Sequence, residues 1–152
     1  KTNLRLLTHW KQVQNNEVRY KEYFLDDAEI VVIGFGTAGR VALSAVREAR
    51  AQGIKVGLFR PITVSPFPVE ALNQLTGQVR AILVTEMNMG QMLDDVQMVV
   101  RGRVPVDFYG RPGGVVPFPD EILSEIQRIN TAPVAEYSDP RDAWLTRMNA
   151  RA

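Results

Sequence analysis

The stretch VVIGFGTAGR, residues 31–40, decides how the rest of the chain is interpreted. Its glycines, Gly34, Gly36 and Gly39, have the spacing G-x-G-x-x-G. An apolar run precedes them and a helical pattern follows, which predicts a strand, a tight turn and a helix. In dinucleotide-binding folds, such a turn lets a phosphate approach the backbone at a helix N-terminus. Glycine is equally favoured wherever a strand turns sharply into a helix that packs closely on its sheet.

The residues that follow the turn argue against a dinucleotide site. The NAD version needs an acidic residue at the end of the second strand, about 20 residues further on, to hold the ribose hydroxyls. In this chain the place is occupied by Gly57, Leu58, Phe59 and Arg60. Arg60 could in principle meet the 2′-phosphate of NADP, but a stiff proline-rich loop follows it directly. We therefore keep a free-standing Rossmann-like NADP-binding module only as the alternative function.

Outward from the turn, apolar runs alternate with segments of helical spacing. Strands are predicted at 29–34, 54–59, 79–86 and 104–110. Helices are predicted after the first glycine turn, from Pro68, from about Met89 and from Pro119. This alternation predicts an α/β fold, a three-layer sandwich with a mainly parallel sheet and helices on both faces. Pro105, near the start of the last strand, favours an edge position for it.

The two ends of the chain lack this alternation. Residues 1–28 are interpreted as a linker or packing arm, with a partly frayed N-terminal helix as an equal alternative. Residues 29–130 form the expected α/β domain. Residues 131–152 are expected to be an irregular tail, in which Trp144 either docks on a neighbour or stays loose.

Composition excludes several classes of function. The 152 residues suit one domain, and 18 Lys and Arg balance 17 Asp and Glu, so neither nucleic-acid nor membrane-surface binding is expected. With no cysteine and one histidine, His9, the chain cannot build a disulfide, a cysteine-ligated cluster or a histidine-based metal site. We expect a cytoplasmic protein. Because the first residue is not Met, we also expect a piece of a longer polypeptide.

In parallel α/β sheets, ligands and partners meet the carboxyl ends of the strands. The predicted contact residues at these ends, for a neighbouring domain or an anion, are Thr37, Arg40, Glu86, Asn88, Gln91 and Arg111. For Glu86 a satisfied structural carboxylate is favoured over a catalytic role, and for Arg111 an ion pair between subunits is favoured. The neighbouring acids Asp94 and Asp95 are expected to cap a helix or face solvent. No residue is predicted to be catalytic, to bind a cofactor or to hold a metal.

Three long stretches, 26–68, 82–96 and 105–117, occur in an order that resembles one domain of the 2-oxoacid:ferredoxin oxidoreductases. It is similar to the transketolase-C-terminal-like domain of the subunit that carries the thiamine pyrimidine-binding domain. The resemblance runs from about Asn16 to Ile129. NEVRYKEYFLDDAEI and FYGR resemble the 2-oxoisovalerate type most, with the 2-oxoglutarate type close behind.

The resemblance implies a complex that decarboxylates a 2-oxoacid on thiamine diphosphate with Mg²⁺. It would pass electrons through iron–sulfur clusters to ferredoxin and form an acyl-CoA. Within such an oligomeric complex this domain would be a scaffold that packs against other domains and subunits. The sequence departs from a thiamine-diphosphate site, since it has no G-D-G followed by about two dozen residues and an asparagine pair that would hold Mg²⁺ and the diphosphate. We therefore expect this chain alone to be inactive and to bind none of these cofactors.

Overall fold

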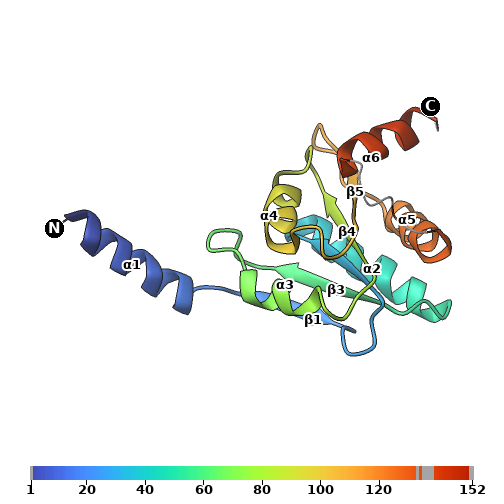
Figure 1. Ribbon diagram of the computed structural model, residues 1–152. Helices are drawn as coiled ribbons and strands as arrows, with labels where there is room; N and C mark the ends of the chain where they lie inside the picture. Colours follow the sequence, from blue (N-terminus) through green and yellow to red (C-terminus); the bar gives the residue numbers. More distant parts are fainter. Residues whose placement is uncertain (1, 133, 135–138, 151–152) are drawn as a thin grey trace.

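The computed structural model describes residues 2–132, 134 and 139–150, in which helices and strands alternate along the chain (Figure 1). The strands of this part are β1 (Tyr20–Tyr23), β2 (Ile30–Gly34), β3 (Val56–Pro61), β4 (Ala81–Glu86) and β5 (Val106–Gly110). The helices are α1 (Thr2–Asn16), α2 (Gly36–Ala51), α3 (Val69–Leu75), α4 (Gln91–Val100), α5 (Pro119–Thr131) and α6 (Pro140–Asn149).

The strands form one sheet in the order β1-β3-β2-β4-β5. Strands β3, β2, β4 and β5 are parallel, and only β1 runs antiparallel, against β3. The central strand β2 is buried at every residue because a strand lies on each side and helices cover its faces. Strand β5 lies at an edge, as its proline predicted.

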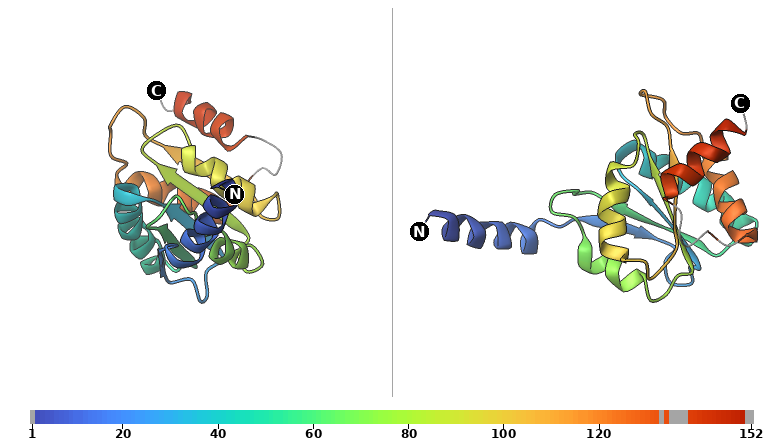
Figure 2. Two further views of the ribbon diagram at one scale, coloured as in Figure 1. Left: turned by 90° about the vertical axis from the view of Figure 1, so that its left-hand side faces the viewer. Right: turned by 45° about the horizontal axis from the view of Figure 1, so that its top comes forward.

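The helices cover both faces of the sheet. Helices α2 and α5 contact each other on one face, and α3 and α4 contact each other on the opposite face (Figures 1 and 2). Their apolar stripes, which include Val46, Leu93 and Ile126, are fully buried against the strands. The predicted three-layer α/β sandwich is therefore confirmed, and its core lies on either side of β2 and β4.

The glycine spacing in the first turn is explained by backbone packing. A Cβ atom at Gly39 would lie 2.4 Å from the carbonyl oxygen of Gly34, so only glycine lets α2 approach β2 this closely. Gly36 has a φ of 56°, a left-handed conformation in which side chains are strained. The pattern thus has a structural cause that needs no bound nucleotide.

The N-terminal segment differs from the expectation in one respect. Helix α1 buries no residue and projects away from the sheet, as an arm would (Figure 2). Residues 20–23, however, belong to the sheet as β1, where Tyr20 pairs with Pro61 and stacks on Phe59 with ring centroids 5.2 Å apart. The short, polar segment YKEY has no periodic pattern, so its pairing with β3 was missed. The expectation that the folded domain begins at residue 29 stays a prediction.

The expectation of an irregular tail is wrong where the structure describes that segment. Residues 140–149 form α6, which begins at an Asp139 cap and contacts β5. Trp144 is only 4% exposed, and its indole meets the ring of Phe108 edge-on. Arg147 donates a 2.9 Å hydrogen bond to the buried carboxylate of Asp107. These contacts with β5 stabilise a helix whose own sequence carries no helical periodicity.

Candidate functional site at the carboxyl edge of the sheet

The carboxyl ends of β2 and β4 lie side by side, but their loops lead to opposite faces of the sheet, to α2 and to α4. Such a divergence leaves a crevice where α/β folds commonly bind ligands. Here the crevice has a volume of about 330 Å³. It is lined by residues 35–38 of the first turn and by residues 85–88 at the end of β4. Of the predicted contact residues, Thr37, Glu86 and Asn88 meet there.

Glu86 is committed to the start of α4. Its side chain is 5% exposed, and its two carboxylate oxygens each accept a 2.9 Å hydrogen bond, from the N–H groups of Met92 and Leu93. These N–H groups belong to the first helical turn, which has no intrahelical acceptor for them. A negative charge there also suits the helix dipole. We therefore revise the role of Glu86 from partner contact to the capping of α4, the structural role that the sequence favoured.

Asn88 shapes the same turn. Its side-chain oxygen accepts hydrogen bonds from the N–H groups of Gly90, at 2.8 Å, and Gln91, at 3.1 Å. Gln91 itself is exposed on the first turn of α4 and lies outside the β2–β4 crevice. After β4, the side chains of Glu86 and Asn88 thus accept hydrogen bonds from the backbone of the loop and of α4.

Arg111 forms an ion pair with Glu121 of the same chain, through hydrogen bonds from its Nε, at 3.3 Å, and from a terminal nitrogen. The acid that pairs with Arg111 thus lies in the same chain, and an ion pair between subunits stays a prediction. Glu121 also accepts a 2.8 Å hydrogen bond from the N–H of Phe118, which caps α5. The pair consequently fixes the β5–α5 loop, and sequence alone could not reveal it because either partner was free to pair elsewhere.

The surroundings shift the pKa values of this cluster. Burial, together with the hydrogen bond to Glu121, raises the pKa of the Tyr109 phenol to about 12. Burial opposes ionisation of Glu121, but hydrogen bonds from Arg111 and Phe118 outweigh it and lower the carboxyl pKa. The hydrogen bond to Glu121 in turn raises the pKa of Arg111. At neutral pH the cluster is therefore a neutral phenol beside a charged, paired carboxylate.

Helix α6 contacts the β4–α4 loop, a feature that the sequence did not indicate. Arg141 donates hydrogen bonds to the carbonyl oxygens of Met89, at 3.0 Å, and Gly90, at 2.8 Å. It also forms an ion pair with Asp94. Asp94 is one of the two neighbouring acids that were expected to cap a helix or face solvent. Arg141 therefore ties the tail to the β4–α4 loop.

Thr37 and Arg40 lie exposed in the first turn of α2, as expected for groups that could meet a partner or an anion. Of the two, only Thr37 lines the crevice. Arg60, the residue considered for NADP, packs its stem against the backbone of α2 near Gly39. Its Nε is buried and makes no hydrogen bond within the described part of the chain. These arginines lie outside the β2–β4 crevice.

Exposed apolar side chains are a second feature of this edge, and the sequence interpretation missed them. Each of the four parallel strands is followed by a loop that carries at least one large apolar residue exposed by 40% to 61%. We call these residues the carboxyl-edge surface: Phe35, Ile62, Val64, Met89, Val115, Val116 and Phe118. Apolar residues inside proline- and glycine-rich loops were the signal that could have revealed them.

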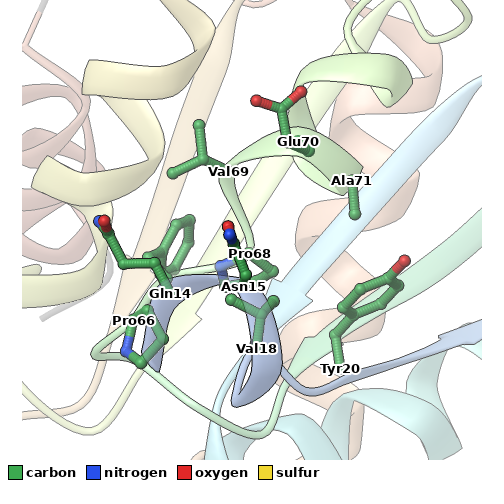
Figure 3. A pocket seen from close by; sticks show the side chains of 10 residues that line it. Gln14, Asn15, Val18, Tyr20, Pro66, Pro68, Val69, Glu70 and Ala71 are labelled. Carbon is green, nitrogen blue, oxygen red and sulfur yellow. The ribbon is translucent and has the colours of Figure 1, made fainter. Parts of the chain in front are cut away.

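A larger hollow of about 510 Å³ lies at the same end of β3 (Figure 3). It is formed by the end of α1, the start of β1 and the loop that leads into α3, with Val18, Tyr20, Pro66 and Val69 around it. Among the described residues that line it, Glu70 is the only ionisable side chain besides the tyrosine. Because β1 is antiparallel to β3, helix α1 leaves the sheet at this carboxyl edge.

The donor groups of the site do not fit a thiamine diphosphate–Mg²⁺ centre or an iron–sulfur cluster. Among the residues that the structure describes, no group of three or more His, Cys, Asp or Glu side chains could hold a metal ion. The sequence contains no cysteine to ligate a cluster. The carboxylate best placed to hold a metal, Glu86, already accepts two backbone hydrogen bonds. In the same part of the chain, no helix is long and apolar enough to cross a membrane.

The sequence matches the family of the pyruvate:ferredoxin oxidoreductase core domain II over residues 28–122. The ketoisovalerate oxidoreductase subunit VorB of Methanothermobacter thermautotrophicus is 41% identical over 127 residues, which cover 84% of this chain and 36% of that protein. The 2-oxoglutarate synthase subunit KorA of Methanothermobacter marburgensis is 40% identical over 101 residues, covering 66% of this chain and 27% of that protein. The chain thus spans about a third of the relatives it matches.

Two solved structures share the fold. A 2-oxoglutarate:ferredoxin oxidoreductase from Magnetococcus marinus, with 2-oxoglutarate, coenzyme A and succinyl-CoA bound, superposes with a TM-score of 0.65 at 20% identity. The match covers 78% of this chain and 21% of that one. A split-gene transketolase, an inactive β4 tetramer, gives a TM-score of 0.63 at 18% identity, covering 74% of this chain and 42% of that one. The transketolase-C-terminal-like fold expected from the sequence is therefore present.

Proposed function

Because this chain belongs to the family of the pyruvate:ferredoxin oxidoreductase core domain II, we propose that it is the assembly domain of a 2-oxoacid:ferredoxin oxidoreductase subunit. Its task is to pack against neighbouring domains and subunits through the carboxyl edge of its sheet. The chain itself carries out no chemical step. Its contribution to the activity is to hold the catalytic domains of the complex in their relative positions.

The carboxyl-edge surface is the observation that carries this proposal. Large apolar side chains exposed on one side of a domain are typical of protein–protein contacts. Here they come from four successive strand-end loops, whereas two of the charged groups of the same edge, Glu86 and Arg111, are bound within the chain. An edge of this kind suits the burial of apolar area against a partner better than the binding of a charged nucleotide.

The activity of the whole complex follows from the family as part of the proposal. A 2-oxoacid and CoA would be converted to acyl-CoA, CO₂ and reduced ferredoxin. Thiamine diphosphate, Mg²⁺ and the iron–sulfur clusters would be held by other domains, and ferredoxin would meet the complex elsewhere. The relatives include ketoisovalerate and 2-oxoglutarate enzymes at similar identity, so the 2-oxoacid is left open. The proposal also includes that the complex is oligomeric and lies in the cytoplasm.

The alternative, a free-standing NADP-binding module, has no comparable support. The glycines of the first turn are required by the close approach of α2 to β2 at Gly39. No acidic residue stands at the end of β3, and the family match gives the domain another context. Calorimetric titration of the chain with NADPH and NADH tests this alternative, and we expect no heat of binding at millimolar ligand.

The proposed function is tested by assembly of the full-length subunit with its partner subunits. We expect the paired change Ile62→Ser with Phe118→Ser to reduce co-purification of the partners, because both side chains lie on the carboxyl-edge surface. The matched control is Met98→Ser, since Met98 is at least as exposed as either residue but lies on α4 outside that surface. Circular dichroism of the isolated chain should be unchanged in all variants.

Loss of assembly in the paired variant alone would support the proposal. Normal assembly of the paired variant, or equal loss in the Met98 control, would reject the carboxyl edge as the docking surface.

A further inference from the structure

The β2–β4 crevice contains hydrogen-bond donors that the fold does not use. The first backbone hydrogen bond of α2 runs from Gly39 to the carbonyl oxygen of Phe35, at 3.2 Å. The N–H groups of residues 36–38 precede it and therefore have no partner within the helix. Phe35, at the N-cap position, offers no side-chain acceptor to them. Residues 36–38 also line the crevice.

Thr85 provides an independent sign of a ligand. It lines the crevice and is fully buried, yet its hydroxyl makes no hydrogen bond to any residue that the structure describes. A Cβ atom added to Gly34 would point toward α2, because it would lie 2.9 Å from the Cα of Gly39. The methyl group of Thr85 lies 3.2 Å from the same position. The side chain of Thr85 is therefore on the α2 face, beneath the first turn of the helix. A buried hydroxyl without a partner is unfavourable unless something in the crevice satisfies it.

The surroundings restrict the charge of such a ligand. The donors of the crevice are neutral N–H and hydroxyl groups, and none of the described residues in its wall is an arginine or lysine. Glu86 is part of the same wall, but its carboxylate is bound to α4, and no cationic side chain there would balance a second negative charge. A single negative charge therefore suits the crevice better than a doubly charged phosphate. Phe35, Ala38 and Met87 add apolar surface. The combination suits a monovalent anion with a short apolar body.

We propose that the β2–β4 crevice binds the carboxylate of a free short-chain organic acid. The N–H groups at the start of α2 and the hydroxyl of Thr85 donate to its oxygens, and Phe35 and Met87 contact its apolar part. This binding does not rest on the proposed assembly function, although Phe35 belongs to both the crevice and the carboxyl-edge surface.

The test is an NMR titration of the ¹⁵N-labelled 152-residue chain with isobutyrate. We expect saturable shifts of the amide signals of residues 36–38, and none with isobutyramide, which has the same shape without the charge. Thr85→Val removes the hydroxyl at nearly constant shape and should weaken isobutyrate binding about tenfold, as expected for one hydrogen bond to a charged group. Thr8→Val is the matched control, because Thr8 lies on the projecting α1.

A thermal unfolding scan separates this role from a structural one. Because the hydroxyl of Thr85 has no protein partner in the described residues, Thr85→Val should leave the melting temperature unchanged or raise it. A clear fall would assign the hydroxyl to the fold and overturn the proposal. So would non-saturable shifts, equal binding of isobutyramide, tighter binding of inorganic phosphate, or unchanged affinity in the Thr85 variant.

The same titration on the assembled full-length complex identifies the source of the carboxylate. Retained binding supports a free acid. Loss of binding on assembly would overturn the free acid as the ligand and assign the crevice to a carboxylate side chain of a neighbouring domain. Neither result depends on whether the carboxyl-edge variants assemble.

Discussion

The indole ring of Trp144 lies edge-on against the phenyl ring of Phe108, with ring centroids 5.4 Å apart and planes at 81°. This contact joins α6 to the edge strand β5, and α6 in turn reaches the β4–α4 loop through Arg141. Edge-to-face aromatic pairs are favourable beyond the area that they bury. The C-terminal helix is therefore part of the folded domain.

Removal of this indole should destabilise the whole domain. We expect Trp144→Ala to lower the free energy of unfolding by about 3 kcal/mol, because it leaves a cavity beside Phe108. Urea unfolding followed by circular dichroism measures the change. Leu145→Ala, on the exposed side of the same helix, should cost less than about 0.5 kcal/mol. Equal losses in the two variants would mean that α6 does not dock through Trp144.

The carboxylate of Glu86 should contribute strongly to stability, although it lies at a predicted contact edge. We expect Glu86→Gln to lower the free energy of unfolding by about 2 kcal/mol, because an amide can accept only one of the two hydrogen bonds from Met92 and Leu93. Chemical denaturation is the measurement. Glu70→Gln is the matched control, since Glu70 lies exposed in the first turn of α3. A loss as large in the control would contradict the capping role.

Arg111 and Glu121 should be energetically coupled within the isolated chain. A double-mutant cycle with Arg111→Met and Glu121→Gln should give a coupling energy of about 1 kcal/mol, because the pair is only partly exposed and bidentate. The cycle is measured by denaturation in low salt. A coupling near zero, together with impaired assembly of Arg111→Met, would instead support the ion pair between subunits that the sequence favoured.

Tyr109 should ionise well above the ordinary pH range of a tyrosine. Burial, together with the hydrogen bond to Glu121, raises its pKa from 10.0 to about 12, so the folded state retains this proton at a pH where the unfolded chain has lost it. The stability that this group contributes is therefore complete below pH 10 and falls as the pH rises from 10 to about 12. A tyrosinate absorbance titration should show one late step that is missing in Tyr109→Phe. A late step that persists in this variant would refute the assignment.

Truncation should separate the arm from the sheet. Deletion of residues 1–17 should change the free energy of unfolding by less than about 0.5 kcal/mol, because α1 buries no residue. Deletion of residues 1–25 should lower it by about 2 kcal/mol or more, because it removes β1 and the Leu25 side chain that packs over Gly57. Thermal scans of both truncated chains compare them. If the longer deletion is as stable as the shorter one, residue 29 is the correct start of the domain.

The sequence by itself determined the architecture around the first turn. The apolar run 30–34, the glycines up to Gly39 and the helical spacing that follows are local patterns, and the apolar runs and helical spacing recur in the later strands and helices. Continuous apolar runs predict strands that are buried on both faces, and a period of 3.6 residues predicts helices with one apolar face, so the parallel three-layer sandwich could be predicted without contacts. The long ordered motifs also sufficed to predict the family.

The tertiary structure alone decided what the polar side chains do and where the chain ends dock. The segment 20–23 pairs with β3, and α6 packs on β5, although neither has a periodic pattern of its own. Glu86, Arg111 and the hydroxyl of Thr85 were all placed at one edge by the order of the strands, but only their surroundings distinguish a cap, an ion pair and an unpaired donor. Hydrogen bonds and ion pairs between residues distant in sequence leave no local pattern, because either partner could have paired elsewhere or with water.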